Sequence, residues 1–231
     1  MSKESTVSNG KQIFWLAAGR IFAMLITFFM PFFLTRFLTK SEYGIYAQFN
    51  SVSLFLMTIF SFGFPTSLYY FVPRSSNDRE KRAVVGNTCL ALMIGSFLAC
   101  ILLMLPWMQN HVIGSRELLA YLPFLLVSII LFMPTEIMEP LYVTVRDHRI
   151  SLWYPSVIIL IKVFAVILCA VLLKGIKGVL LGVIICDIFL FISTLFYGIW
   201  KTDGFHRGRM KDYFSLSLLK KQCLYVYPFG L

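Results

Sequence analysis

The sequence predicts an all-α integral membrane protein, a bundle of six transmembrane helices followed by the start of a seventh. Apolar residues make up 58% of the 231-residue chain, and only 14% are charged. A globular domain is typically about 45–50% apolar and about 25% charged, so lipid is the expected main solvent. The apolar residues also fall into long stretches, each long enough for the roughly 20 residues that a spanning helix needs.

Short loops join these stretches, which predicts a single helical bundle over residues 1–231 with no soluble domain. The predicted spans are Gln12–Leu34, Ile45–Phe71, Val84–Trp107, Leu118–Val145, Leu152–Leu173 and Val179–Trp200. The first is too long for the roughly 7–15-residue core of a signal peptide and lacks an A-x-A-like cleavage site, so it is expected to stay uncleaved. The fourth carries Pro134 and Pro140 late in the span, which predicts a kinked or shorter helix.

A seventh apolar stretch begins at Gln222 and runs to Leu231. As a helix it rises about 15 Å, half of the roughly 30 Å hydrocarbon layer. We therefore expect either that the chain is a piece of a longer protein or that this tail lies in the membrane interface.

Basic residues are distributed unevenly between the loops. Of 21 Lys and Arg, 14 lie in the N-terminus and the second, fourth and sixth loops, and five lie in the odd-numbered loops. Basic residues near span ends stay on the cytoplasmic side, so the N-terminus and even loops are predicted to be cytoplasmic. The net charge of +10 follows from this asymmetry and from anionic membrane lipids, and nucleic acid is not an expected partner. The basic segment Lys201–Lys221 either rests on lipid headgroups or only fixes topology.

Catalytic and metal-binding motifs are missing from the sequence. It contains no G-x-S-x-G, H-E-x-x-H or G-x-x-x-x-G-K-[ST] pattern, and its three histidines lie in separate loops. The five cysteines lie in or beside apolar stretches, a spacing that supports neither a disulfide framework nor a zinc site. We expect a protein that is not an enzyme and needs no cofactor or metal.

Five ionisable residues inside the spans are the best functional candidates, namely Arg20, Glu136, Glu139, Lys162 and Asp187. Charge is costly in the membrane and usually faces a cavity or another charge. Lys162 and Asp187 lie at heights about 3 Å apart on consecutive helices, so they form either a structural ion pair or part of a transport site. Glu136 and Glu139 share a helical face, where they either share a proton, bind a cation or stay solvated.

Two segments resemble a known family. Leu34–Tyr46, with its E-Y-G-x-Y pattern, resembles the connection between the first two spans of bacterial polysaccharide and O-antigen flippases. Phe62–Phe71 is similar to that family's glycine-containing stretch before its first cytoplasmic loop. The motifs cover residues 34–71, and the resemblance in hydropathy covers the whole chain. We interpret Glu42, Tyr43 and Gly44 as a turn, with Tyr43 an interfacial anchor and Gly44 a permissive backbone position.

The resemblance implies one lobe of a two-lobed transporter of about twelve to fourteen spans, within the multidrug/oligosaccharidyl-lipid/polysaccharide exporter superfamily. Such a flippase moves polyprenyl-diphosphate-linked sugar across the bacterial cytoplasmic (inner) membrane by alternating access, for polysaccharide, lipopolysaccharide or O-antigen assembly. Its partners would be the lipid-linked oligosaccharide, membrane lipids and a second lobe or polysaccharide-assembly proteins. By resemblance, Arg20, Arg74 and Lys162 are the candidates for binding the diphosphate.

Three acids inside the spans outnumber the two cations there, which keeps other functions open. In a cation-coupled multidrug exporter of the same superfamily, Glu136, Glu139 and Asp187 would carry cation or proton coupling. An integral-membrane glycosyltransferase or acyltransferase is a third hypothesis, disfavoured because no loop offers a catalytic constellation. A scaffold fragment that transports nothing is a fourth.

Overall fold

The computed structural model describes residues 21–22, 24–113, 116–145, 148–201 and 213–227. The described part contains helices and no strand. After a helix at Met24–Phe37 come α2 (Lys40–Phe60), α3 (Phe64–Arg74), α4 (Asp78–Met104), α5 (Pro106–Met108), η1 (Gln109–Ile113), α6 (Arg116–Leu119), α7 (Leu122–Phe132), η2 (Met133–Ile137), α8 (Met138–Thr144), α9 (His148–Leu173), α10 (Ile176–Lys201) and α12 (Leu216–Val226).

Within the described residues, four segments are long and apolar enough to cross a membrane: Asp78–Met104, Leu122–Thr144, Trp153–Leu173 and Ile176–Gly198. The bent pair α2 and α3 makes a fifth if it is counted as one span. The chain is therefore a multi-pass helical membrane protein, with four to five candidate spans among its described residues. Part of the predicted first span, Gln12–Leu34, falls outside the described residues, and its described helix, Met24–Phe37, is shorter than a span.

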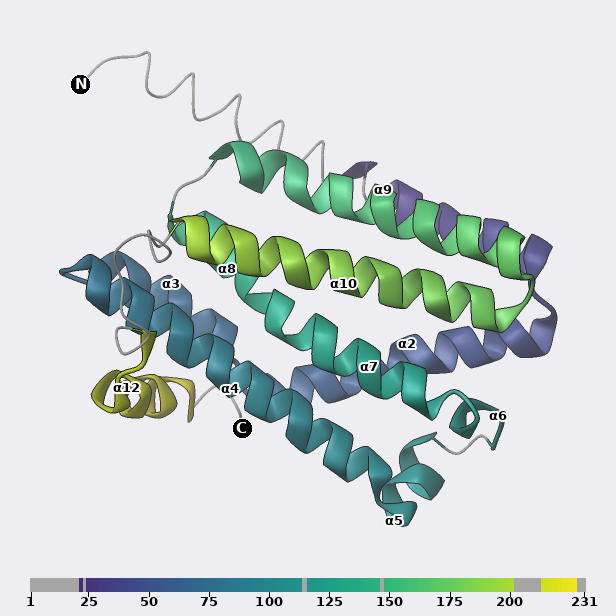
Figure 1. The fold of residues 1–231 in the computed structure, drawn as a ribbon, viewed down its shortest axis with the longest axis horizontal. Coiled ribbons are helices and arrows are strands. Elements are labelled where there is room, and N and C mark those ends of the chain that lie inside the picture. Colours follow the sequence, from purple (N-terminus) through teal and green to yellow (C-terminus); the bar gives the residue numbers. More distant parts are fainter. Residues whose placement is uncertain (1–20, 23, 114–115, 146–147, 202–212, 228–231) are drawn as a thin grey trace.

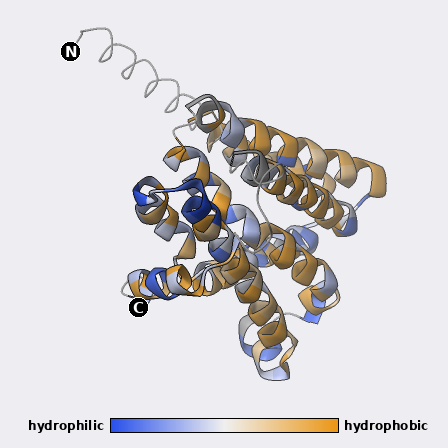
Figure 2. Cartoon of the chain, turned by 60° about the vertical axis from the view of Figure 1, so that its left-hand side comes forward, coloured by the Kyte–Doolittle hydropathy of each residue, from blue (hydrophilic) through white to orange (hydrophobic). Residues whose placement is uncertain are grey.

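The long helices lie side by side in one bundle (Figure 1), in which α10 contacts α9 and α7 while α3 contacts α4 and α8. Figure 2 shows hydrophobic residues along their length and hydrophilic residues mainly at helix ends and connections. We name the two ends of the bundle after one residue each. The Glu42 end holds the start of α2 and the link between α9 and α10, and the Arg74 end holds the link between α3 and α4.

The second predicted span is broken rather than continuous. Helices α2 and α3 meet at an angle of 48°, and Phe62 and Gly63 between them have positive φ angles of 47° and 68°. Gly63 adopts this backbone conformation without strain because it lacks a Cβ, and Pro65 then occupies the first turn of α3, where a missing N–H is tolerated. The helix axis changes direction inside the membrane-spanning part of the chain.

The fourth span changes helix type at the predicted position. Its α-helical part ends at Phe132, and Met133–Ile137 form a 3₁₀ turn before α8. Pro134 lacks an N–H and cannot continue the α-helical hydrogen-bond ladder. The prediction was a kinked or shorter helix, and the structure has a 3₁₀ turn within one candidate span, Leu122–Thr144, in place of the predicted Leu118–Val145.

Both interruptions meet at one glycine of α4. A Cβ at Gly95 would overlap the carbonyl oxygen of Phe60, at the end of α2, and the methyl of Met133, at the start of η2. Glycine therefore lets the two broken spans approach α4 closely. Gly178 and Gly182 do the same on α10, where a Cβ would overlap the backbone of α9, as small residues spaced by four commonly do between membrane helices.

The last described helix begins earlier than the sequence predicts. The expected seventh stretch starts at Gln222, whereas α12 begins at Leu216 and includes Lys220 and Lys221. These two lysines were assigned to a loop because hydropathy marks apolar residues rather than helix ends. Both are exposed on α12, while Gln222 and Val226 are buried against the bundle.

Candidate functional site

A cleft of about 720 Å³ opens between α3, α8 and α9. It lies in the half of the bundle toward the Arg74 end, because its α3 residues, Pro65 to Tyr69, follow the bend after Phe60. Tyr69, Tyr142 and Tyr154 each contribute a ring from a different helix. The volume lies within the roughly 300–1,000 Å³ that small-molecule sites occupy.

Two carboxylates from the interrupted span line this cleft. Glu136 belongs to η2 and is half-buried, and Glu139 belongs to α8 and is exposed. The 3₁₀ turn places residues three apart on the same side, so the spacing predicted from the sequence brings both into one cleft. The turn is held locally by Thr135, whose hydroxyl donates to the carbonyl of Phe132 at 2.6 Å.

The tyrosines of the cleft are positioned by neighbouring side chains. The hydroxyl of Tyr154 lies 2.8 Å from the hydroxyl of Ser193 on α10. The ring of Tyr142 meets that of Tyr154 edge to face, with centroids 6.2 Å apart, a geometry that aromatic pairs favour. The described residues that line the cleft include no Lys or Arg.

A second, smaller cavity of about 40 Å³ lies between α2, α7, α9 and α10. Asn50 and Ser53 of α2, Lys162 of α9 and Asp187 of α10 line it. Asp187 is only 1% exposed, and its carboxylate accepts a 2.5 Å hydrogen bond from Ser128 of α7. Ser53 is also buried, and its hydroxyl has no hydrogen-bond partner among the described residues.

Lys162 and Asp187 line the same cavity but, in the described structure, do not form the direct ion pair that was one of the two alternatives left open. No contact within 4 Å joins their charged groups in the described structure, where Ser128 is the partner of Asp187. The ammonium of Lys162 instead lies 5.9 Å from the ring centroid of Phe132. Phe132 lines both the cleft and the small cavity.

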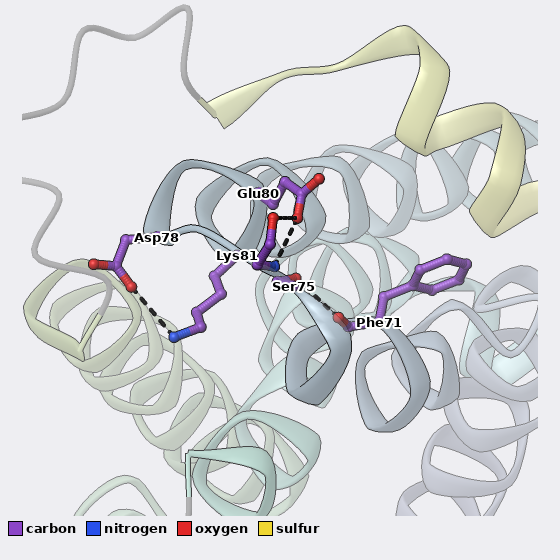
Figure 3. A network of polar contacts seen from close by, with 6 residues as sticks. Phe71, Ser75, Asp78, Glu80 and Lys81 are labelled. Carbon is purple, nitrogen blue, oxygen red and sulfur yellow. Dashed lines mark hydrogen bonds and ion pairs between the residues drawn. The ribbon is translucent and has the colours of Figure 1, made fainter.

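Arg74 lies apart from both cavities, at the end of α3. Its guanidinium sits 3.9 Å from the ring centroid of Tyr70 and donates to that residue's carbonyl at 3.2 Å. The other member of this stack is Tyr225 of α12, whose ring lies 4.8 Å from that of Tyr70. In the first turn of α4, Lys81 forms a 3.2 Å ion pair with Asp78 (Figure 3).

Helix α12 is joined to α3 and α4 by a buried polar cluster. The amide nitrogen of Gln222, a fully buried residue, lies 3.1 Å from the hydroxyl of Ser67 and 3.0 Å from that of Thr88. One residue before Thr88, the Asn87 amide donates to the carbonyl of Ser215 at 3.0 Å and accepts from its N–H at 3.3 Å. The segment from Ser215 to Gln222 is thus attached to the bundle at two points.

Glu42 lies in the first turn of helix α2, so the turn predicted for Glu42, Tyr43 and Gly44 is wrong. One carboxylate oxygen accepts from the N–H of Thr39 at 2.8 Å, closing a capping box at the start of α2. The other accepts from the N–H of Ile176 at 3.2 Å, so that α2 is tied to the start of α10. The prediction for Gly44 is wrong, because Gly44 lies inside α2 without a positive φ.

Comparison with known proteins assigns this membrane bundle to a family. A family model described as "Polysaccharide biosynthesis protein" matches residues 10–230, which is nearly the entire chain. The chain belongs to the polysaccharide biosynthesis protein family. Searches of curated proteins and of solved structures gave no match.

In this polysaccharide biosynthesis family member, the two described basic candidates, Arg74 and Lys162, lie apart from each other. Arg20 lies outside the described residues, Arg74 is exposed at one end of the bundle, and Lys162 lines the small cavity. The roles assigned to them by resemblance therefore stay predictions. Sequence reasoning missed the three tyrosines of the cleft because tyrosine in a membrane protein is also common as an interfacial anchor.

Proposed function

We propose that this chain is one lobe of a transporter that moves a polyprenyl-diphosphate-linked sugar across the bacterial cytoplasmic membrane. The observation that carries the proposal is a cleft lined by carboxylates and tyrosines inside the spanning part of a polysaccharide biosynthesis family member. A sugar carries many hydroxyls and is expensive to place in hydrocarbon without hydrogen-bond partners. The sugar headgroup would cross along such polar surfaces while the polyprenyl tail stays in lipid.

Alternating access requires segments that change direction without loss of secondary structure. The bend at Phe62–Gly63 and the 3₁₀ turn at Met133–Ile137 are such segments, and both border or adjoin the cleft. Short irregular segments of this kind are where hinge motions are absorbed. In this proposal α3 and α8 move relative to α4 and open the cleft alternately to each side of the membrane.

The orientation proposed here places the Arg74 end in the cytoplasm, as the 14-to-5 distribution of basic residues favours. Arg74 is then exposed at the side where a lipid-linked sugar is loaded, and its guanidinium can bind phosphate oxygens. Lys162, deeper in the bundle, would meet the diphosphate only during transit. Arg20 stays a candidate on resemblance alone.

The test is transport by the protein from the complete reading frame, reconstituted in proteoliposomes with a fluorescent polyprenyl-diphosphate N-acetylglucosamine. Glu136→Gln should lower the rate of transfer between leaflets, whereas Glu117→Gln, at the opposite end of the bundle, should not. A wild-type protein that accelerates no transfer over protein-free vesicles would contradict the proposal.

Export of organic cations is a second candidate, favoured by the two glutamates and three tyrosines of the cleft and by the absence of Lys and Arg from its described lining. Carboxylates and aromatic faces are the groups that attract a lipophilic cation. Binding of tetraphenylphosphonium that depends on Glu136, together with failure to bind any lipid-linked sugar, would select this function over the first.

A further inference from the structure

The cleft is chemically unsuited to the diphosphate of a lipid-linked sugar. Glu136 and Glu139 both line it, and no Lys or Arg is among the described residues that do so. A diphosphate placed there would meet the half-buried carboxylate of Glu136 with no Lys or Arg among the described lining residues to balance it, in surroundings of lower dielectric constant than water, where like charges repel strongly. The diphosphate is therefore better accommodated outside this cleft.

The same groups suit a polyhydroxylated ring. Sugar hydroxyls are hydrogen-bond donors, and carboxylates are acceptors that form stronger hydrogen bonds than neutral groups do. Tyr69 and Tyr154 add flat apolar faces with hydroxyl groups at their edges, so they can bury an amphipathic ring on one side and hydrogen-bond it on the other.

The cleft is also held in shape by contacts outside it. Tyr154 is held through the hydroxyl of Ser193, and Tyr142, which is 4% exposed, packs edge to face against it. Glu136 is fixed in a 3₁₀ turn that Thr135 stabilises. A site whose groups are already positioned loses less conformational entropy when it binds a ligand.

We infer that this cleft is the subsite for the sugar headgroup, specific for neutral or amino sugars and selective against acidic ones. The inference rests on the proposed function and adds to it which part of the substrate binds where. A uronic acid would bring a third carboxylate to Glu136 and Glu139, whereas a hydroxyl or amino group would donate to them.

The test measures equilibrium binding to the full chain in phosphatidylcholine nanodiscs with three probes. These are polyprenyl diphosphate, polyprenyl-diphosphate N-acetylglucosamine and polyprenyl-diphosphate glucuronic acid. The wild type should bind the N-acetylglucosamine lipid about tenfold more tightly than either other probe, which corresponds to about 1.4 kcal/mol. Equal binding of all three would overturn the subsite, and the proposed function would stand if transport still occurred.

Two cleft variants and two matched controls locate the effect. Glu136→Gln and Tyr69→Leu should each lose most of the preference for the N-acetylglucosamine lipid. Both variants should keep their affinity for polyprenyl diphosphate within about twofold, which would show that they are folded. Glu136→Gln should also bind the glucuronic acid lipid more tightly. Glu117→Gln and Tyr227→Leu, outside the cleft, should behave as the wild type.

The remaining outcomes separate the inference from the function on which it rests. Cleft variants that keep the full preference, or that weaken binding of all probes equally, overturn the sugar subsite alone. A wild type that binds none of the three lipids overturns the proposed function and the subsite with it.

Discussion

The carboxylate of Asp187 is hydrogen-bonded to the hydroxyl of Ser128 at 2.5 Å and is not ion-paired with Lys162. This bond joins α10 to α7 in the interior of the bundle, where Asp187 is 1% and Ser128 3% exposed. A buried acceptor that loses its donor keeps the full penalty of having left water. Ser128 is therefore a structural partner of Asp187 that the charge pattern of the sequence did not indicate.

Replacing Ser128 by Ala should destabilise the protein by about 1–3 kcal/mol, because Asp187 would lose its hydrogen-bond donor. Ser96→Ala is the matched control, since Ser96 is equally buried but donates only to the carbonyl of Met93 in its own helix. Thermal unfolding in detergent should rank Ser128→Ala below Ser96→Ala. Equal midpoints for the two variants would contradict the importance of the bond.

The two interrupted spans should depend on Gly95. Gly95→Ala should destabilise the bundle by about 1–3 kcal/mol, because the added methyl overlaps the carbonyl of Phe60 and the methyl of Met133. At Gly44 in α2, a Cβ would meet no atom within 4 Å, so Gly44→Ala should be neutral or stabilise by up to about 1 kcal/mol through helix propensity. The unfolding midpoints of the two variants should move in opposite directions or differ clearly, and similar losses in both would argue against close packing at Gly95.

The candidate membrane-spanning segments were the part of the fold that could be predicted from the sequence, because the lipid environment determines their length and composition. Hydropathy located candidate spans such as Val84–Trp107, which the structure places at Asp78–Met104, because the thickness of the membrane sets the number of apolar residues. The same signal could not locate the bend at Phe62–Gly63. Glycine and proline are tolerated in membrane helices whenever neighbours satisfy the freed backbone groups, so their presence does not distinguish a straight span from a broken one.

The candidate site was predictable only within one helix. The spacing of Glu136 and Glu139 placed them on one side, since that depends on local geometry alone. The similar depths of Lys162 and Asp187 agree with their lining one cavity. Depth does not predict how each helix is rotated about its axis, so the sequence did not indicate that Ser128 of α7 would be the hydrogen-bond donor to Asp187. Tyr142 and Tyr154 come into contact only when α8 and α9 pack together, so no spacing in the sequence predicts this contact.

Glu42 should stabilise the Glu42 end of the bundle through its carboxylate. Glu42→Ala removes the acceptor for Thr39 and for the N–H of Ile176, so we expect a loss of about 1–2 kcal/mol, as for other helix caps. Glu117→Ala is the control, because the Glu117 carboxylate is exposed and accepts from the Ser41 hydroxyl. If thermal unfolding in detergent shows no larger loss for Glu42→Ala, the link between α2 and α10 does not contribute to stability.

The predicted orientation can be tested by cysteine labelling in a variant without the five native cysteines. Position 78, at the start of α4, should be inaccessible to a membrane-impermeant maleimide added to intact cells and accessible after permeabilisation. Position 40, at the start of α2, should be labelled in intact cells. The reverse pattern would show that the Arg74 end faces outward.

Gln222 should hold α12 against the bundle. Its side-chain nitrogen lies within hydrogen-bond distance of Ser67 on α3 and of Thr88 on α4, and a Gln222→Ala variant would lose these bonds from a fully buried position. Buried hydrogen bonds contribute about 1 kcal/mol each, so opening of residues 213–227 should become roughly 5- to 30-fold more frequent. Hydrogen–deuterium exchange should then speed up in α12 while α9 and α10 keep their protection.

Gln109→Ala is the control, since the amide of Gln109 bonds only to the carbonyl of Met104 in the neighbouring turn. Faster exchange throughout the bundle would mean that Gln222 stabilises the whole lobe, and unchanged exchange in α12 would mean that its ring stack with Tyr70 is sufficient to hold it.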